Sequence, residues 1–123
     1  MVENAISQQL DYGGIYLVRF DPAKGAEVGK QRPAIVLQSS SMLKAGVPTV
    51  LVCPLTSQMR PELEIIRVEI PSRDSLAQCS YAMVEHIRSI SVRRITHRKL
   101  AQISQTEHSQ LRDKVLIVMG FDV

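Results

Sequence analysis

Short apolar segments alternate with polar stretches that contain glycine and proline along most of the chain. Because these segments are rich in β-branched residues and are bounded by turn-forming residues, they predict strands. The predicted strands cover residues 15–20, 34–38, 49–55, 65–70, 81–90 and 100–103. Pro54 falls within the third of them. Since proline cannot donate a ladder hydrogen bond, we expect a strand end or a sheet edge there.

The period of the pattern changes near the C-terminus. The apolar residues that recur there at helical spacing are Leu111, Val115, Val118 and Met119. Ser104 and Glu107 have the spacing of a capping box, and Gly120 is a favourable residue for ending a helix. We therefore predict an amphipathic helix over residues 106–119, whose apolar stripe serves the core or an interface.

Many short strands followed by one terminal helix predict a mainly β fold with an α-helical addition. We expect an SH3-like small β-barrel or curved antiparallel sheet over residues 13–123. A polar, frayed and flexible segment at residues 1–12 precedes it in this prediction. Residues 39–46 are expected to form a loop with room for one helical turn. The sequence has no internal repeat and no phosphate-binding glycine motif.

The composition is that of an ordinary globular protein, with 45% hydrophobic and 22% charged residues. No apolar run is long enough to span a bilayer, and the N-terminus lacks the features of a signal peptide. We therefore expect a cytoplasmic protein without membrane association. Cys53 and Cys79 are expected to be free thiols. Because neither has a second ligand at metal-binding spacing, we expect no metal site and no cofactor.

The formal charge of +3 is a mild basic excess that is compatible with a nucleic-acid partner. The basic residues that gather in one segment are Arg88, Arg93, Arg94, His97, Arg98 and Lys99. This cluster is either a solvated surface or part of a binding face. Aromatic residues make up only 4% of the chain, which argues mildly against binding of single strands by base stacking alone.

The connection between the first two predicted strands is unusually long for a hairpin. It spans residues 21–33, contains several charges and glycines, and ends at Arg32 and Pro33. Proline favours an extended conformation of the residue before it, so the Arg32 side chain starts from a rigid position. Its guanidinium offers a planar set of donors suited to a phosphate, and a surface salt bridge is the alternative.

Three polar residues, Thr56, Ser57 and Gln58, follow the apolar third strand. A strand end is a rigid place from which to hold a substrate group. The alternative is an ordinary turn, in which threonine and serine are common.

The fifth predicted strand carries Glu85 in the segment VEHIRS. Alternation along a strand would place Glu85 with Met83 and Ile87 on an apolar face, so its carboxylate would have to be paired or protonated. It is therefore either a site residue or one half of a structural Glu–Arg pair. His86 and Arg88 would share the opposite face, which could belong to the basic surface.

The order of these segments resembles that of the PemK/MazF family of toxin endoribonucleases. The likeness runs from Gly14 to about Gly120 and rests on the segments IYLVRFDPAKGAEVGKQRPAIVL, VCPLTSQ and YAMVEHIRSI. They resemble the family's first two strands with the intervening Asp-Pro-x-x-Gly-x-Glu loop, its Thr-x-Gln strand end, and its strand with an acidic residue and Gln before a basic residue.

This resemblance implies an SH3-like barrel that forms a homodimer and pairs with an antitoxin protein. It also implies metal-independent cleavage of single-stranded RNA. In that reaction the ribose 2′-hydroxyl attacks the adjacent phosphorus and leaves a 2′,3′-cyclic phosphate and a 5′-hydroxyl. The family's catalytic arginine and threonine fall on Arg32 and Thr56.

The roles implied for this chain follow from the needs of that reaction. Arg32 is expected to stabilise the transition state, Thr56 to position a phosphate oxygen, and Glu85 to act as base or orienting group. The loop at 21–31 is expected to form a lid over an RNA groove. The residues expected to bind RNA are Lys24, Gly25, Glu27, Lys30, Pro33, Ser57, Gln58, His86, Arg88 and Ser89.

The chain departs from the family pattern at three places. Gly13 and Gly14 stand where Gly-Asp is usual, and His86 replaces a glutamine, which could change base preference. The segment QCS at 78–80 replaces a glycine-rich turn. The alternative function is that of a toxin of the same fold that poisons DNA gyrase, which does not need the Arg–Thr pair. A barrel that binds RNA without chemistry is a third possibility.

Overall fold

The computed structural model describes residues 2–20, 30–95 and 99–121. Its strands are β1 (Gly14–Arg19), β2 (Gln31–Val36), β3 (Thr49–Thr56), β4 (Arg67–Ile70), β5 (Ser80–Met83), β6 (Arg88–Ser91) and β7 (Ala101–Gln102). Its α-helices are α1 (Val2–Gln8), α2 (Ser40–Lys44) and α3 (Gln105–Met119). Short 3-10 segments lie at η1 (Pro61–Ile66), η2 (Val84–His86) and η3 (Val92–Arg94).

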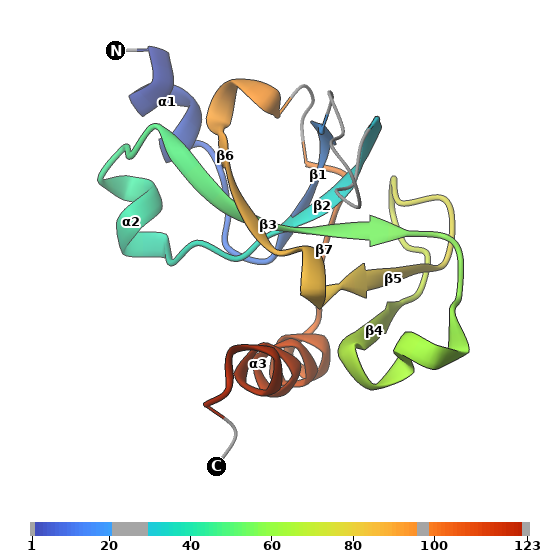
Figure 1. The fold of residues 1–123 in the computed structure, drawn as a ribbon. Coiled ribbons are helices and arrows are strands. Elements are labelled where there is room, and N and C mark those ends of the chain that lie inside the picture. The colour runs from blue at the N-terminus through green and yellow to red at the C-terminus, as the bar shows by residue number, and fades with distance from the viewer. Residues whose placement is uncertain (1, 21–29, 96–98, 122–123) are drawn as a thin grey trace.

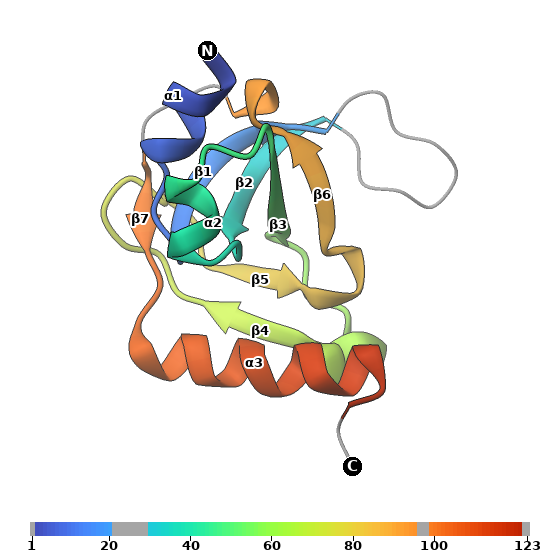
Figure 2. The ribbon, with the colours of Figure 1, turned by 90° about the vertical axis from the view of Figure 1, so that its left-hand side faces the viewer.

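The strands form one antiparallel sheet in the order β4-β5-β3-β2-β1-β7, with β6 paired to the first half of β3. A bridge between Val18 of β1 and Ile95, which follows η3, joins the two sides of the curled sheet. Figures 1 and 2 show α3 lying across one end of the sheet, next to β4, with α1 and α2 at the opposite end. The expected curved antiparallel sheet with a C-terminal helix is thus confirmed.

Two apolar cores lie on the two faces of the curled sheet. The first core includes Ile15, Ile35 and Leu55 and is covered by Leu111 of α3. The second includes Val18 and Val52, and α1 and α2 pack against it through Ile6 and Leu43. The central strands are therefore buried on both faces, which agrees with their nearly continuous apolar sequence.

The predicted strand at 81–90 is wrong as one continuous element, because η2 separates β5 from β6. Ala82 lies opposite Leu55 and Arg88 opposite Val52, so the chain takes up three extra residues at this point. Those residues form the 3-10 turn. The alternation that placed Glu85 on an apolar strand face therefore does not apply.

Pro54 lies within β3 and not at a sheet edge, contrary to the prediction. Pro54 lies opposite Ala34 on β2, three pairs beyond the hydrogen-bonded pair Leu37 and Leu51. Because hydrogen-bonded and non-bonded pairs alternate, its nitrogen points away from β2, toward the β5–β6 side. Because that nitrogen carries no hydrogen, the ladder is interrupted there, and η2 stands beside the gap. The proline thus marks a bulge between two strands.

The expected frayed segment at residues 1–12 contains the helix α1. Ile6 packs against the second core, Leu10 is buried in it, and Glu3 forms an ion pair with Arg93. The spacing of Ile6 and Leu10 matches one helical face, a signal that is short and easily overlooked. The domain boundary expected near residue 12 stays a prediction.

Smaller differences concern element ends. β2 begins at Gln31, before the expected start, and the residues that precede β4 form η1 in place of a longer strand. The turn expected within 39–46 is α2. Within the described residues, no helix has the length and apolarity needed to cross a membrane. Cys53 and Cys79 are both free thiols, as predicted.

The terminal helix α3 begins and ends as its sequence predicts. Ser104 and Glu107 form the capping box, and Gly120 ends the helix with a left-handed φ of 82°. Glu107 also accepts two hydrogen bonds from Arg73, at 2.7 and 2.5 Å. Burial alone raises the pKa of the Glu107 carboxyl, but the hydrogen bonds from Arg73 and Ser104 outweigh it and hold the pKa below its ordinary value.

We expect Glu107→Gln to lower the free energy of unfolding at pH 7 by about 1–3 kcal/mol, because Arg73 loses its charged acceptor. A carboxyl with a depressed folded-state pKa stabilises the fold above its unfolded-state pKa of about 4.3 and loses that contribution as the pH falls through the folded-state pKa. The variant should therefore lose less stability than the parent between pH 5 and about pH 3, as measured by urea unfolding. An unchanged pH dependence, or an equal effect of Glu62→Gln on the exposed η1, would contradict this.

Candidate active site

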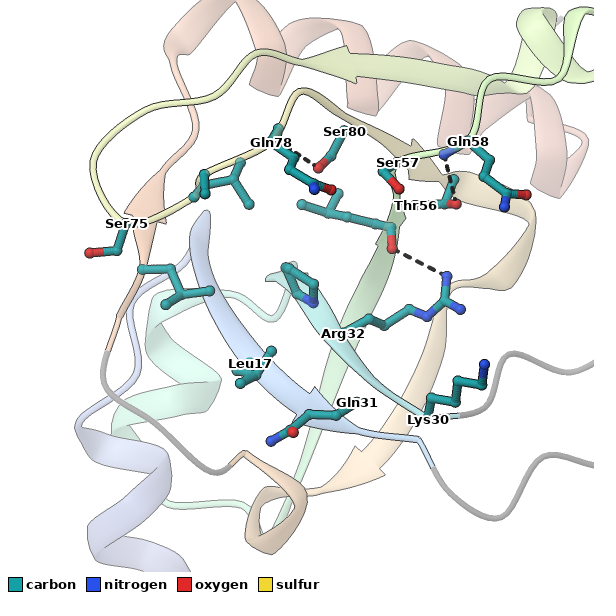
Figure 3. Close-up of a pocket in the computed structure, with 15 residues that line it drawn as sticks. Leu17, Lys30, Gln31, Arg32, Thr56, Ser57, Gln58, Ser75, Gln78 and Ser80 are labelled. Carbon is teal, nitrogen blue, oxygen red and sulfur yellow. Dashed lines mark hydrogen bonds between the residues drawn. The ribbon is translucent and has the colours of Figure 1, made fainter.

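An open groove of about 550 Å³ lies where the ends of β2 and β3 meet the loop that precedes β5. Figure 3 shows Arg32, Thr56, Ser57 and Gln58 on one side of it and Ser75 and Gln78 on another. The predicted site residues that line the groove are Lys30, Arg32, Pro33, Thr56, Ser57 and Gln58. The structure thus brings together two segments that are more than twenty residues apart in the sequence.

Arg32 lines the groove and is partly buried. Its Nη1 donates a hydrogen bond to the Leu55 carbonyl oxygen at 3.4 Å, while its buried Nε has no hydrogen-bond partner. Burial lowers the pKa of the guanidinium, which nevertheless remains a cation near neutral pH. No carboxylate in the described part of the chain forms a salt bridge with it. A partly buried cation with an unused donor is suited to an anionic ligand.

Thr56 ends β3 beside Arg32. The β2–β3 pairing ends at Ala34 and Pro54, and Arg32 and Thr56 each lie two residues beyond it, where both line the groove. The Thr56 Oγ1 accepts a hydrogen bond from the Gln58 backbone nitrogen at 3.2 Å, which fixes the turn that follows. Its hydroxyl hydrogen remains able to donate to a phosphate oxygen.

Lys30 stands at the mouth of the same groove. Its carbonyl oxygen accepts a hydrogen bond from the Phe20 nitrogen at 2.8 Å, which closes the β1–β2 hairpin. Its φ of 65° is in the left-handed region, an uncommon conformation for a residue other than glycine. The local backbone thus starts β2 at a defined angle next to Arg32.

Sequence reasoning missed the groove wall formed by the chain between β4 and β5. Ser75, Leu76, Ala77, Gln78 and Ser80 line the groove. The signal that could have found them is the segment QCS at 78–80, which stands where the family pattern has a glycine-rich turn. Gln31, at the start of β2, was missed as well.

Four predicted site residues, Glu85, His86, Arg88 and Ser89, are not among those that line the groove. Glu85 accepts hydrogen bonds from the Arg67 Nε at 3.1 and 3.0 Å and forms an ion pair with its Nη2. The structural Glu–Arg pair, one of the two readings of the sequence, is therefore present. His86 Nε2 lies 3.9 Å from the same carboxylate, and the Arg88 guanidinium lies 5.9 Å from the centre of the Phe20 ring.

Lys24, Gly25 and Glu27 lie outside the described residues, as does the rest of the expected lid except its last two residues, Lys30 and Gln31. Within the described ranges, no group of three His, Cys, Asp or Glu side chains is arranged to hold a metal ion.

Comparison with known proteins decides the family. A family profile described as PemK-like, MazF-like toxin of type II toxin-antitoxin system matches residues 11–119. The chain belongs to this family. It is 28% identical over 109 residues to the endoribonuclease MazF of Staphylococcus saprophyticus, which covers 88% of this chain and 89% of that protein. This confirms the resemblance inferred from the sequence.

Solved MazF structures share the fold. A crystal structure of MazF from Deinococcus radiodurans has a TM-score of 0.77 and 24% identity, covering 90% of this chain and 96% of that one. A MazE–MazF structure from the same organism has a TM-score of 0.71 and 24% identity, covering 91% and 96%. The SH3-like architecture is thus that of the MazF toxins.

The departure of this PemK/MazF family member at Gly13-Gly14 has a structural reason. Gly13 has a φ of 79°, a conformation that favours glycine. A Cβ atom at Gly14 would lie only 2.7 Å from the ring of Tyr16. The Tyr16 hydroxyl in turn accepts a hydrogen bond from the Asp11 nitrogen at 3.0 Å. An aspartate at this place would require the buried tyrosine to move.

Proposed function

We propose that the protein is the toxin of a toxin–antitoxin pair and cleaves single-stranded RNA at specific sequences without a metal ion, which inhibits translation and growth. The observation that carries this proposal is that Arg32 and Thr56 line the same open groove. The buried Nε of Arg32 has no hydrogen-bond partner there. The endoribonuclease activity of the S. saprophyticus relative supports it.

The proposed reaction is an intramolecular displacement at phosphorus. The ribose 2′-oxygen bonds to the phosphorus as its proton leaves, and the bond to the 5′-oxygen breaks as that oxygen gains a proton. The products carry a 2′,3′-cyclic phosphate and a 5′-hydroxyl. Arg32 stabilises the additional negative charge on the phosphorane, and Thr56 donates to a non-bridging oxygen.

The reaction also needs a group that protonates the 5′-oxygen and a base that accepts the proton of the 2′-hydroxyl. The lowered pKa of Arg32 makes it a better acid than an exposed arginine, so it is our candidate for protonating the 5′-oxygen. Glu85 was the candidate base from the sequence, and that role stays a prediction. Its pairing with Arg67 favours a structural role instead.

Incubating the protein with a defined single-stranded RNA in EDTA tests the proposal. We expect cleavage at a limited set of sites, with cyclic-phosphate and 5′-hydroxyl ends identified by mass spectrometry. Absence of cleavage, or cleavage only after added Mg²⁺, would contradict it. The alternative of gyrase poisoning receives no support from the family match or the relatives above, and inhibition of DNA supercoiling without RNA cleavage would favour it.

We further propose that the cognate antitoxin binds as an acidic segment that is disordered when free and competes with RNA for the groove. The MazE–MazF structure from D. radiodurans supports a protein partner for the toxin. The antitoxin complex, by this proposal, also carries the DNA-binding function of the pair.

We expect a homodimer, because apolar side chains remain exposed beside α3. A groove of about 230 Å³ between α3 and the sheet is lined by Leu37, Leu51, Ile87, Val115 and Met119, among others. Leu51 is 38% and Met119 61% exposed, which leaves apolar surface for a second copy. Light scattering at micromolar concentration should give twice the mass of the chain, and Met119→Glu should shift it toward the monomer. A monomeric parent protein would contradict this expectation.

A further inference from the structure

The loop between β4 and β5 forms a wall of the proposed RNA groove, opposite the start of β2. Its contribution consists of Ser75, Leu76, Ala77 and Gln78. Leu76 is only 3% exposed and anchors this loop in the first core. The residues on either side of Leu76 are exposed, so the wall presents Ser75, Ala77 and Gln78 to a ligand.

Arg73 fastens this wall to the body of the protein. Its Nε donates to the Pro71 carbonyl oxygen at 3.1 Å and its Nη1 to the Gln102 carbonyl oxygen at 3.2 Å, in addition to the two bonds to Glu107. Three elements, the loop, β7 and α3, are thus joined through one guanidinium. Such a multiply bonded arginine loses little freedom when a ligand binds, because it is already ordered.

The backbone of the loop is held as firmly as its arginine. Arg73 and Leu76 exchange backbone hydrogen bonds of 3.0 and 2.8 Å, and the Ser75 nitrogen donates to the Leu100 carbonyl oxygen at 3.0 Å. The Ser80 hydroxyl donates to the Gln78 carbonyl oxygen at 3.0 Å. The Gln78 main chain is therefore fixed on both sides, which presents its side chain from a rigid support.

The side chain of Gln78 is the largest polar side chain that the residues 75–78 contribute to this wall. In Figure 3 it extends toward the part of the groove that carries Ser57. It is exposed, and its amide makes no hydrogen bond within the described residues, although its backbone does. A primary amide offers two donors and one acceptor without charge, which suits the edge of a base better than a phosphate.

We propose that Gln78 reads one base of the RNA and so helps to determine the cleavage sequence, with Arg73 as the residue that positions it. This inference rests on the proposed function. The arrangement separates two tasks within one groove. Arg32 and Thr56 act on the phosphate on one side, and the uncharged amide of Gln78 selects the nucleotide from the other.

A cleavage profile over a randomised single-stranded RNA library tests the role of Gln78. We expect Gln78→Ala to reduce the preference at one nucleotide position by about tenfold, the usual size of a lost base contact. Gln78→Glu, which keeps only acceptors, should shift the preference at that same position toward a base with a donor. Gln110→Ala, an exposed glutamine on α3 outside the groove, should leave the profile unchanged.

Arg73→Lys tests the positioning role, because it keeps the charge and loses the paired bonds to Glu107. We expect a weaker preference at the position that Gln78 reads, and no further loss when Arg73→Lys is added to Gln78→Ala. An unchanged preference in Arg73→Lys would overturn the positioning role. If the parent protein cleaves RNA and Gln78→Ala has the same cleavage profile, the base-reading role of Gln78 is overturned and the proposed function is not. If the parent protein cleaves no RNA, both are overturned.

Discussion

Replacing Arg32 with alanine is expected to lower the rate of RNA cleavage by about 10²–10³-fold, the usual cost of removing one preorganised donor from a transition state. The guanidinium lies in the groove, bound to the Leu55 carbonyl oxygen, with its Nε unpaired. The Arg32 side chain is therefore held in place before the substrate binds. Little of the substrate's binding energy is then needed to order this side chain. Most of the loss should appear in kcat, since the charge it stabilises develops during the reaction.

The matched control is Arg60→Ala, which removes an arginine of the same charge from an exposed position outside the groove. Arg32→Lys keeps the charge but not the planar set of donors, so we expect it to recover only part of the activity. Single-turnover cleavage of a defined RNA measures the effect, and circular dichroism checks the fold. Because the Arg32 side chain makes only one hydrogen bond within the described residues, its loss should leave the fold intact. Full activity of Arg32→Ala would remove the basis of the proposed mechanism.

The parts of the fold that could be predicted are those encoded by local pattern. The capping box and Gly120 define α3, and runs of β-branched residues define β1 and β3. In the same way Arg32 and Thr56 could be singled out, because each stands at one end of an apolar strand. Arg32 precedes Pro33, and Thr56 precedes the polar residues Ser57 and Gln58. These signals depend on residues close together in the sequence, which is why they survive without knowledge of the fold.

The parts that could not be predicted depend on which strands become neighbours. The turn η2 exists because β5 and β6 both pair with β3, on either side of the point where Pro54 offers no hydrogen. The second wall of the groove forms because Arg73 meets Glu107, which is 34 residues away in the sequence. Contacts over such separations leave no local pattern, so the departure from the family pattern at residues 78–80 marked this segment without showing that Gln78 lines the groove.

Removing the carboxylate of Glu85 should have the largest effect on stability. Arg67 is nearly inaccessible, with a side chain only 6% exposed, and Glu85 is its partner through several hydrogen bonds. We expect Glu85→Ala to lower the free energy of unfolding by about 3 kcal/mol, because it leaves a buried cation without a counter-charge. Urea unfolding at neutral pH measures this. Glu64→Ala, an exposed acidic residue in η1, should change the value by no more than about 0.5 kcal/mol.

The double variant Arg67→Met with Glu85→Met separates the structural role of Glu85 from a role as base. It removes both charges and keeps apolar bulk, so most of the lost stability should return, as is common when a buried ion pair is replaced as a unit. It also removes the Glu85 carboxylate, which therefore can no longer accept a proton from the 2′-hydroxyl. Because Glu85 is engaged by Arg67 and does not line the groove, we expect the double variant to cleave RNA at nearly the parent rate. A stable double variant that has lost cleavage, with Arg32 and Thr56 untouched, would instead identify Glu85 as the base.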